Sequence, residues 1–590
     1  MEKRVFLAIV LSFGILAVYQ NYIVPPQVAP PAAAPTGPAG APAALTQGAA
    51  TPAAPEVAAI TPAPIEMPAT LVGDTEARDI IVNTDTVYAV FSTEGATIKS
   101  WRLKKYFDTN GEPLDLIPPQ LPANYPHPFT LATDQDAVSA VLSVAKFKPS
   151  SLGPLSLGAA PGTLSFEYQD ETGLTARKSF HFQPDGMPYM MTVDASVDVQ
   201  GVARPVTLKF GPAVGIGYST GGRMTAAYPS AAVFHKDGSV ERPSASSLLE
   251  QPAYEGVMRF AGVGDQYFLS AAIPGTRSVR MEFQPVTLPT PEPDATETGV
   301  TERSFVSYSV STPGAMNMPF FVGPKDFDVL KAVDTQLVRA IDFGIFAWLV
   351  VPLLQSLKWI NTYVGNFGWS IVLLTIILNA IMFPLRHRSM VSMRKMQEIQ
   401  PEVKAIQKRY EKLKITDPDR QKMNTEMMAL YKQRGVNPAS GCVPMLLTMP
   451  VLFAFYAMLS VAIELRGAPF FGWITDLSQM DPLYITPVLM GVTMFVQQKM
   501  TPSTADPAQQ KIFMFMPLIF MVMFLWAPAG LVIYWLMSNI MTVGQQFMTN
   551  RMIGSPSKPG STGPEALGGT SAERRAKQAG RAATPKAQGK

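Results

Sequence analysis

A long uncharged and strongly apolar stretch in the C-terminal half of the sequence limits most strongly what this chain can fold into. Residues 512–548 form a run of 37 residues without a charged side chain. A helix of about 20 apolar residues crosses the ~30 Å hydrocarbon core of a bilayer, so this run is too long for a single crossing. The segment Ala527-Pro528-Ala529-Gly530 interrupts the run near its middle, because proline and glycine break helices. We therefore predict two transmembrane helices, at 511–527 and 529–548.

Other apolar runs raise the predicted number of membrane spans to six. Residues 1–24 predict an N-terminal transmembrane anchor, in which three charged residues precede an uncharged stretch. A cleaved signal peptide is the alternative, but the small residues that suit cleavage lie well beyond the apolar stretch, at 32–34. The chain is 16% charged, against about 25% in soluble proteins, which agrees with a membrane protein. The remaining transmembrane helices are predicted at 366–385, 443–463 and 483–499.

Two segments follow the anchor, and they differ sharply in composition. Residues 25–70 form a Pro- and Ala-rich linker with 12 prolines, which cannot bury a core and is predicted to be disordered. Residues 71–323 contain short runs of alternating polar and apolar residues, separated by Gly, Pro, Asp and Asn. Because such alternation is typical of half-buried strands, we predict a large all-β sandwich in which no helix is required.

Neither catalysis nor metal binding is indicated by the sequence. The motif Gly217-Tyr-Ser-Thr-Gly221 fits the G-x-S-x-G pattern of a nucleophile elbow, but the residues after it indicate a loop instead of the required helix. A glycine-rich turn is therefore favoured over a catalytic serine. The single cysteine, Cys442, and four widely separated histidines form no metal-ligand motif. We expect no enzymatic activity, no cofactor and no metal.

A change of periodicity marks the end of the β domain. Residues 324–362 place apolar side chains at helical spacing among charged ones, which predicts an amphipathic helix on the membrane surface. The later part of this segment is more apolar, but Pro352, Gln355 and Lys358 interrupt it. We therefore interpret it as interfacial and not as a membrane span.

Loop charges predict the orientation in the membrane. The segment from Arg386 to Arg434 contains 13 basic and six acidic residues, and the predicted disordered tail, 549–590, contains eight basic and two acidic residues. Basic loops remain on the cytoplasmic side, so both termini should be cytoplasmic and the β domain periplasmic. The net charge of the whole chain is only +3, which argues against a dedicated nucleic-acid binder.

The basic cytoplasmic segment, 386–440, is predicted to be a helical hairpin. Its apolar residues recur at spacings of three and four, and Pro401 falls where the first arm would bend or restart. The apolar stripe should pack the arms together and leave a basic exterior for anionic lipid or ribosomal RNA. The recruitment surface is predicted at Arg394, Lys395, Lys404, Lys408, Arg409, Met427 and Met428.

Several short motifs in the membrane half resemble one known family. They are Ile381-Met-Phe-Pro-Leu385, Met427-Met-Ala-Leu-Tyr431, Asn437-Pro-Ala-Ser-Gly-Cys-Val-Pro444, Met490-Gly-Val-Thr-Met494 and Ser538-Asn539. Over residues 324–550 the sequence closely resembles the YidC/Oxa/Alb family of membrane protein insertases, and the anchor and β domain match its Gram-negative form.

The resemblance implies a function, a site and partners. It implies an inner-membrane insertase and chaperone that moves hydrophobic segments of nascent proteins into the lipid, alone or with the Sec translocon, without nucleotide or metal. It also implies a five-helix core enclosing a hydrophilic groove that is open to the cytoplasm and the lipid. The implied partners are nascent membrane proteins, the Sec translocon, the ribosome and the signal-recognition-particle receptor. Binding to anionic lipid alone is the alternative for the basic hairpin and tail.

The candidate groove residues come from the spans. Thr375, Asn379 and Arg386 share one helix face, and the resemblance implies that close relatives carry a groove arginine where this chain has Asn379. Arg386 is positioned to supply the charge instead, while a helix–helix hydrogen bond is the alternative role for Asn379. The full predicted set is Thr375, Asn379, Arg386, Thr448, Gln497, Tyr534 and Trp535, the two aromatic residues being assigned by the resemblance with packing as the alternative.

Two other classes of function compete with the insertase. A small-solute transporter also needs polar residues inside the membrane, but the spans show none of the inverted symmetry typical of transporters. A membrane-anchored periplasmic enzyme would act through the β domain, which offers no acid–base pair. An interaction or regulatory module is the favoured interpretation of that domain.

Overall fold

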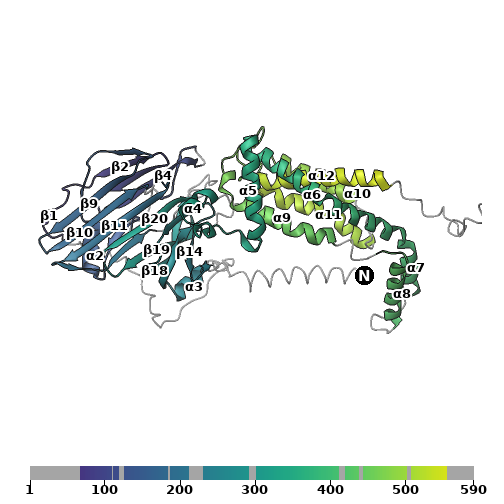
Figure 1. Cartoon of the computed structure of the whole chain (residues 1–590), viewed down its shortest axis with the longest axis horizontal. Helices are drawn as coiled ribbons and strands as arrows, with labels where there is room; N and C mark the ends of the chain where they lie inside the picture. The colour runs from purple at the N-terminus through teal and green to yellow at the C-terminus, as the bar shows by residue number, and fades with distance from the viewer. Residues whose placement is uncertain are drawn as a thin grey trace, which may run out of the picture. The chain divides into compact units, whose positions relative to one another are not determined.

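A computed structural model describes residues 67–553, except 109–110, 118–124, 184–186, 212–229, 292–299, 411–418, 437–442 and 501–506. The predicted anchor, nearly all of the linker, the Gly217–Gly221 motif, Cys442 and most of the predicted tail therefore lie outside the described residues. The chain divides into two compact units, Met1–Asp342 and Phe343–Lys590. Figure 1 shows strands in the first unit and helices in the second, and each unit is described by itself.

The first unit contains two β-sheets. The larger has 15 strands along the order β1-β9-β10-β11-β20-β17-β16-β18-β19-β13-β6, with β7, β12, β14 and β15 paired beside this path, and the smaller has the order β5-β4-β3-β2-β8. Neighbouring strands pair antiparallel except β2 and β8, which are parallel. The strands of the smaller sheet are β2 (Asp79–Thr84), β3 (Val87–Ser92), β4 (Thr97–Phe107), β5 (Pro113–Asp115) and β8 (Leu155–Gly158).

The larger sheet supplies most of the length of the domain. Its early strands are β1 (Thr70–Val72), β6 (Thr130–Ala132), β7 (Lys148–Pro149), β9 (Gly162–Asp170), β10 (Leu174–Phe182), β11 (Met190–Val199), β12 (Val202–Ala203) and β13 (Val206–Phe210). Its later strands are β14 (Ala231–Lys236), β15 (Ser239–Glu241), β16 (Ala253–Gly264), β17 (Phe268–Ala272), β18 (Ser278–Pro291), β19 (Val300–Thr312) and β20 (Met316–Pro324).

An aromatic core joins the two sheets. Phe91 of β3 packs edge-to-face against Phe180 of β10, with ring centroids 4.8 Å apart. Trp101 of β4 donates its indole N–H to the carbonyl of Val322 in β20, over 3.1 Å. The alternation that predicts strands is present in β10, where every second residue from Leu174 is buried. The two sheets therefore form a sandwich whose interior is filled mainly by large apolar side chains.

The described part of residues 71–323 contains two short helices, so the expectation that this segment needs no helix is wrong. They are α2 (Asp136–Val144) and α3 (Ala245–Glu250). Three valines in α2 favour a strand by propensity, but their spacing of three residues places them along one side of a helix. Ser244 caps α3 by accepting a hydrogen bond from the Ser247 amide.

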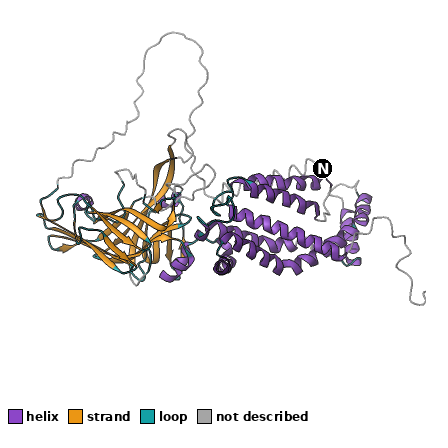
Figure 2. Cartoon of the chain, turned by 90° about the horizontal axis from the view of Figure 1, so that it is seen from above, coloured by secondary structure: helices purple, strands orange, loops and turns teal. Residues whose placement is uncertain are grey.

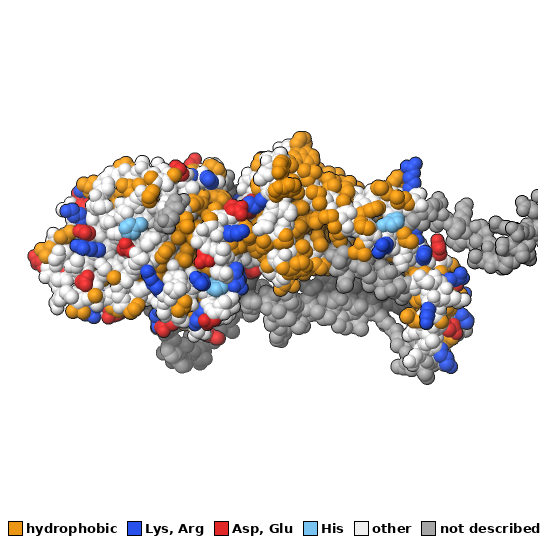
Figure 3. Space-filling model, viewed as in Figure 1, with side chains coloured by type: hydrophobic (Ala, Val, Ile, Leu, Met, Phe, Trp, Pro, Cys, Tyr) orange, Lys and Arg blue, Asp and Glu red, His pale blue; other side chains and the backbone are white. Residues whose placement is uncertain are grey.

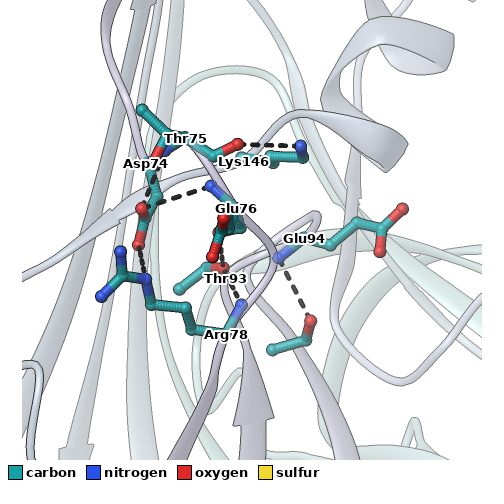
Figure 4. A network of polar contacts seen from close by, with 8 residues as sticks. Asp74, Thr75, Glu76, Arg78, Thr93, Glu94 and Lys146 are labelled. Atoms are coloured by element: carbon teal, nitrogen blue, oxygen red, sulfur yellow. Dashed lines mark hydrogen bonds and ion pairs between the residues drawn. The ribbon is translucent and has the colours of Figure 1, made fainter.

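Polar contacts hold the entry of the chain into the domain (Figure 4). Arg78 forms an ion pair with Asp74 at 3.2 Å, and its backbone amide donates to the hydroxyl of Thr93. Lys146 donates to the carbonyl of Thr75. These contacts tie the segment that follows the linker to β3 and to the residues after α2, so the first strand is anchored on two sides.

The largest fully buried side chains of the sandwich include a lysine. Lys178 of β10 is inaccessible to solvent, and its Nζ donates to three carbonyls, at 3.2 Å from Gly95, 2.8 Å from Ala96 and 2.5 Å from Phe129. Buried carbonyl groups need a hydrogen-bond donor, which in a β-sheet is usually the backbone N–H of a neighbouring strand. For these three carbonyls, the side chain of Lys178 is that donor. Burial lowers the pKa of Lys178 to about 7.

The continuous amphipathic helix expected over 324–362 is divided into four pieces. They are α4 (Phe327–Val333), η3 (Leu337–Ala340), η4 (Gly344–Phe346) and α5 (Ala347–Val364). Asp334 adopts an extended conformation that ends α4, and Gly344 has a φ of 63°, which a helix does not tolerate. Helical spacing alone therefore misses two local backbone breaks.

The second unit is a bundle of helices with a separate hairpin. Figures 1 and 2 show α5 lying across one end of the bundle and α7–α8 beyond the other end. The buried residues of α5, including Leu353 and Leu357, follow helical spacing along one face. Besides α5, the helices are α6 (Phe367–Glu398), α7 (Gln400–Arg409), α8 (Asp419–Gln433), α9 (Val443–Val461), η6 (Ile463–Leu465), α10 (Ile485–Met500), α11 (Pro507–Met523), η7 (Phe524–Trp526) and α12 (Ala529–Ile553).

The surface of the helical unit is rich in hydrophobic side chains (Figure 3). Among the described residues, two helical stretches are long and apolar enough to cross a bilayer, Gly344–Val364 and Phe367–Glu398. Six spans therefore remain a prediction. Helix α6 does not end near Leu385, where the charge pattern placed the membrane boundary, but continues as one helix to Glu398. Helices α10 and α11 have only 16 and 17 residues.

We predict that Lys178 makes the stability of the β domain depend on pH. The lysine has a pKa of about 7 when folded and about 10.5 when unfolded, so between these values the unfolded chain binds more protons and stability rises with pH. Lys178→Met should remove this rise and, at pH 7.5, lower the free energy of unfolding by about 1–3 kcal/mol, because three carbonyls lose their donor. Denaturant unfolding of residues 67–342 at several pH values measures both effects.

The matched control is Lys99→Met, which removes an exposed lysine paired with Asp79. An exposed ion pair contributes about 0–1 kcal/mol, so this variant should keep the pH dependence of the wild-type fragment. A pH dependence that survives in Lys178→Met would show that another group is responsible.

Candidate functional site

Buried polar side chains gather on three helices of an otherwise apolar bundle. Thr375 and Asn379 of α6 are 0% and 4% exposed, and Asn539 and Gln545 of α12 are 5% and 8% exposed. Helix α10 adds Thr493, which accepts a hydrogen bond from Asn539 over 3.4 Å. Polar groups in a membrane bundle normally face protein or water and not lipid, so these three helices share a polar surface. We call it the α6–α10–α12 surface.

Asn379 lies at the centre of this surface. Its Nδ2 donates to the backbone carbonyl of Thr375 at 2.8 Å, which leaves Oδ1 to accept a hydrogen bond from Nη1 of Arg386 at 2.7 Å. Arg386 lies seven residues, or two turns, later on the same helix. Helical side chains point toward the N-terminus, which explains why the long arginine side chain can reach back to Asn379.

Helix α12 closes the network from the other side. Nη1 of Arg386 also donates to the hydroxyl of Thr542 at 3.0 Å. The Nε2 of Gln545 donates to the backbone carbonyl of Asn379 at 3.0 Å. One guanidinium group and one asparagine therefore connect α6 to α12 through both side-chain and backbone groups.

The structure brings together some of the predicted groove residues and separates others. Hydrogen bonds connect Asn379 to the backbone of Thr375 and to the side chain of Arg386. Gln497 lies on another helix, α10, and is half-buried. The side chain of Thr448 lies outside the described residues. Within the part of the chain that the structure describes, the two predicted aromatic residues, Tyr534 and Trp535, form no hydrogen bond with the network, although Tyr534 lies close enough to Arg386 for an electrostatic interaction.

Tyr534 and Trp535 are adjacent in sequence but contact different helices. Tyr534 is buried and stacks on Phe455 of α9, with ring centroids 4.2 Å apart and planes 10° apart. Trp535 packs against Phe520 of α11 and Phe524 of η7, at 5.7 and 4.9 Å. Each aromatic ring therefore fixes a separate neighbour of α12.

Sequence reasoning missed Thr542 as a member of the network. Thr542 accepts from Arg386 and donates its own hydroxyl proton to the Ser538 carbonyl at 2.7 Å. The spacing of Ser538, Thr542, Gln545 and Thr549 by four, three and four residues was the available signal, because it places them on one face of α12.

A buried aspartate organises the loop between α9 and α10. Asp481 is 0% exposed, and its carboxylate accepts from the indole N–H of Trp473, the Leu483 amide, and both the amide and the hydroxyl of Thr486. Burial by itself raises the pKa of Asp481, but the hydrogen bonds from Thr486, Leu483 and Trp473 outweigh it and lower this pKa below its usual value.

The same loop is bonded to the start of α12. The Ala529 amide donates to the Gln479 carbonyl at 2.7 Å, and the Gly530 amide donates to the Leu477 carbonyl at 2.9 Å. Met480 and Pro528 form an isolated antiparallel bridge. The beginnings of α10 and α12 are therefore joined through one loop.

The α7–α8 hairpin has its own small core. Ile399, Val403 and Val436 are buried together, and Met396, Met427, Leu430 and Tyr431 pack against them. Arg434 pairs with Glu402 across the hairpin at 2.6 Å. Of the predicted recruitment residues, Lys395, Lys404, Lys408, Arg409 and Met428 are exposed, whereas Arg394 and Met427 are half-buried.

Comparison with known proteins gives a consistent result over nearly the whole chain. Residues 359–556 match the family model described as 60Kd inner membrane protein, and residues 79–356 match the YidC periplasmic domain. A relative in Geobacter sulfurreducens, the membrane protein insertase YidC, is 38% identical over 94% of this chain and 99% of its own length. The protein of the same name in Citrifermentans bemidjiense is 35% identical over 94% of this chain and 100% of its own length.

A solved structure of an active YidC insertase, with its first transmembrane domain resolved, is also similar to the chain. It covers 81% of this chain and 94% of its own length, with 18% identity and a TM-score of 0.33.

We predict that Asp481 is essential to the folded α9–α10 loop. Asp481→Asn keeps the size of the side chain but removes the charge that accepts four hydrogen bonds, and hydrogen bonds to charged groups contribute about 1.5–3 kcal/mol each. The variant should unfold at a lower temperature in detergent micelles. Because the folded-state pKa is lowered, the stabilisation by Asp481 is present above the unfolded pKa near 3.8 and is lost as the pH falls through the folded value.

Asp476→Asn is the matched control in the same loop. Among the described residues, the carboxylate of Asp476 accepts only from the amide and hydroxyl of Ser478, two residues away, so its loss should lower the unfolding temperature less. Equal effects of the two substitutions would contradict a special role for Asp481.

Proposed function

Because this chain belongs to the YidC family of membrane protein insertases, we propose that it moves hydrophobic segments of nascent membrane proteins into the lipid along the α6–α10–α12 surface. The family is one of inner-membrane proteins with a periplasmic domain, and insertion is not an enzymatic reaction. The proposal therefore concerns how this chain provides a path for its clients, not a chemical step.

The observation that carries the proposal is the partnering of Arg386. Both of its hydrogen bonds use Nη1, and among the described residues its Nε and Nη2 have no partner at hydrogen-bond distance in the network. A guanidinium group offers five N–H donors, so most of its donors remain for a client. Arg386 thus presents a positive charge that Asn379 and Thr542 hold in place.

We propose that Arg386 supplies the charge that close relatives are expected to carry at the position of Asn379. A client whose hydrophobic segment is flanked by a short acidic tail would leave water for the α6–α10–α12 surface, where Arg386 offsets part of the desolvation cost. Asn379, Thr542 and Gln545 would meet uncharged polar groups of the same tail. Half-buried Trp535 would contact the hydrophobic segment, whereas Tyr534, which is buried against Phe455, would support this part of α12 from behind.

The orientation of the chain belongs to the same proposal. We place both termini and the basic α7–α8 hairpin in the cytoplasm, with six spans in total. Exposed Lys404 and Lys408 on α7 would contact the ribosome, the signal-recognition-particle receptor or anionic lipid, and the bundle would work alone or beside the Sec translocon.

The short lengths of α10 and α11 support the proposal that a client's polar tail crosses a thinner hydrocarbon layer beside them. At 1.5 Å per residue, α10 and α11 extend about 24 and 26 Å, against the ~30 Å of an average hydrocarbon core. A bilayer adjusts to short helices by thinning around them, which would shorten the apolar path for a polar tail.

We predict that Arg386→Gln impairs insertion of clients with acidic tails. Loss of a charge-assisted hydrogen bond costs about 1.5–3 kcal/mol, which corresponds to roughly a tenfold or greater loss of insertion rate. Clients with uncharged tails should be affected less. Insertion is measured by protease protection of a single-span client in vesicles that contain the purified full-length variant.

Two further variants make this test specific. Arg388→Gln removes a neighbouring exposed arginine of α6 and should insert both clients normally. Combining Asn379→Arg with Arg386→Gln moves the charge two turns along the same face and should restore acidic-tailed clients. If Arg386→Gln inserts acidic and uncharged tails as well as wild type does, Arg386 is not part of the path.

We predict that the basic face of α7 recruits partners. Lys404→Glu combined with Lys408→Glu should weaken sedimentation with ribosomes at low salt, because like charges then face the RNA backbone, and the difference should shrink as salt rises. Vesicles with anionic lipid provide a parallel readout. A change confined to those vesicles would reassign the face to lipid.

A further inference from the structure

Two neighbouring glutamines near the end of α12 carry polar atoms that the α6–α10–α12 network leaves unused. Gln545 and Gln546 are 8% and 1% exposed. The Nε2 of Gln545 donates a hydrogen bond to the backbone carbonyl of Asn379. Among the described residues, the Oε1 of Gln545 has no hydrogen-bond partner, and neither Oε1 nor Nε2 of Gln546 has one. Three buried amide atoms therefore have unfilled hydrogen-bonding capacity within two adjacent residues.

This arrangement is costly unless something else completes it. A primary amide that is buried without partners loses its hydration and gains nothing in return. Much of α12 consists of leucine, isoleucine and methionine, and such side chains would fill the same volume without this cost. Lipid tails cannot satisfy an amide, so the missing partner must be polar.

The two glutamines extend the polar surface beyond Arg386. Gln545 is bonded to Asn379, which is itself bonded to Arg386, so its free oxygen lies beside the network. Gln546 lies seven residues after Asn539 and so shares its helix face, and Asn539 donates to Thr493 of α10. The unfilled atoms are therefore on faces of α12 that turn toward α6 and α10.

The chemistry of the three atoms limits the partner. Two are acceptors, and the third, Nε2 of Gln546, carries two N–H donors. A phosphate or carboxylate would satisfy only the donor, and a cation only the acceptors. Water offers both donors and acceptors and is the competing occupant, which the experiment below distinguishes. A peptide group also offers one N–H and one C=O, and an extended chain entering a bilayer has both of them unpaired.

We propose that Gln545 and Gln546 bind the peptide backbone of the client's extended polar tail. The inference rests on the proposed function and deepens it, because it names what the tail offers to the protein. The Oε1 atoms accept from backbone N–H groups, and Nε2 of Gln546 donates to a backbone carbonyl. Recognition of the main chain is independent of the client's sequence, whereas Arg386 responds to the charge of the client.

The test uses two clients that differ in backbone donors. One has a six-residue alanine tail and the other a six-residue proline tail, which lacks backbone N–H groups. The wild-type full-length chain in vesicles should insert the alanine tail about threefold to tenfold faster, the factor that one or two neutral hydrogen bonds provide. Gln546→Met should slow the alanine tail more than the proline tail and so reduce the alanine preference, because the alanine tail loses a bond from its N–H as well as one to its carbonyl, whereas the proline tail loses only the latter.

Controls separate this role from folding and from the proposed function. Gln546→Met removes an unpaired amide at nearly constant volume, so its unfolding temperature in detergent should equal or exceed that of wild type. Gln498→Met changes an exposed glutamine of α10 and should preserve the alanine preference. Arg386→Gln should alter the response to tail charge without altering the alanine-to-proline ratio, so failure of one proposal is distinguishable from failure of the other.

Three results would overturn the inference. An unchanged alanine preference in Gln546→Met would show that the amide does not contact the tail. Equal slowing of both tails would indicate that the amide only hydrates the path. A lowered unfolding temperature in Gln546→Met would assign the amide to the packing of the folded bundle.

Discussion

A polar group surrounded by hydrocarbon must find its partner within the protein, and this requirement organises the helical unit. Arg386 is held by Asn379 of its own helix and by Thr542 of α12, and Gln545 returns a bond to the Asn379 backbone. Since these bonds link α6 to α12, the position of one helix fixes that of the other. The apolar exterior and the polar interior are two results of the same constraint.

The sequence predicts the strands better than the breaks between elements. Alternation in β10 agrees with the observed burial, because burial on one face of a sheet imposes a period of two. Helix α2 was missed because its valines favour strands, and the expected helix over 324–362 was divided at Asp334 and Gly344 by local backbone geometry. The boundary placed near Leu385 rested on charge, whereas α6 continues through Pro384 to Glu398.

The candidate site was predictable within one helix and not between helices. The positions of Thr375, Asn379 and Arg386 in the sequence are sufficient to predict that they share one face of a helix. Thr542 and Gln545 become their partners only when α12 packs beside α6, and this packing depends on contacts distant in sequence. Tyr534 and Trp535 illustrate the limit, since successive helical residues point about 100° apart and these two meet different neighbours.

The loop that contains Asp481 joins the beginnings of α10 and α12, and this connection has a mechanical consequence. Two rods joined at one end can separate only as a wedge, so the displacement grows with distance from the joint. Helix α10 is about 24 Å long, and a rotation of about 10° at the loop would move its far end by about 4 Å. Such a rotation would also have to break the bond between Asn539 and Thr493, and the width of the opening would then be set by helix length and its direction by the joined end.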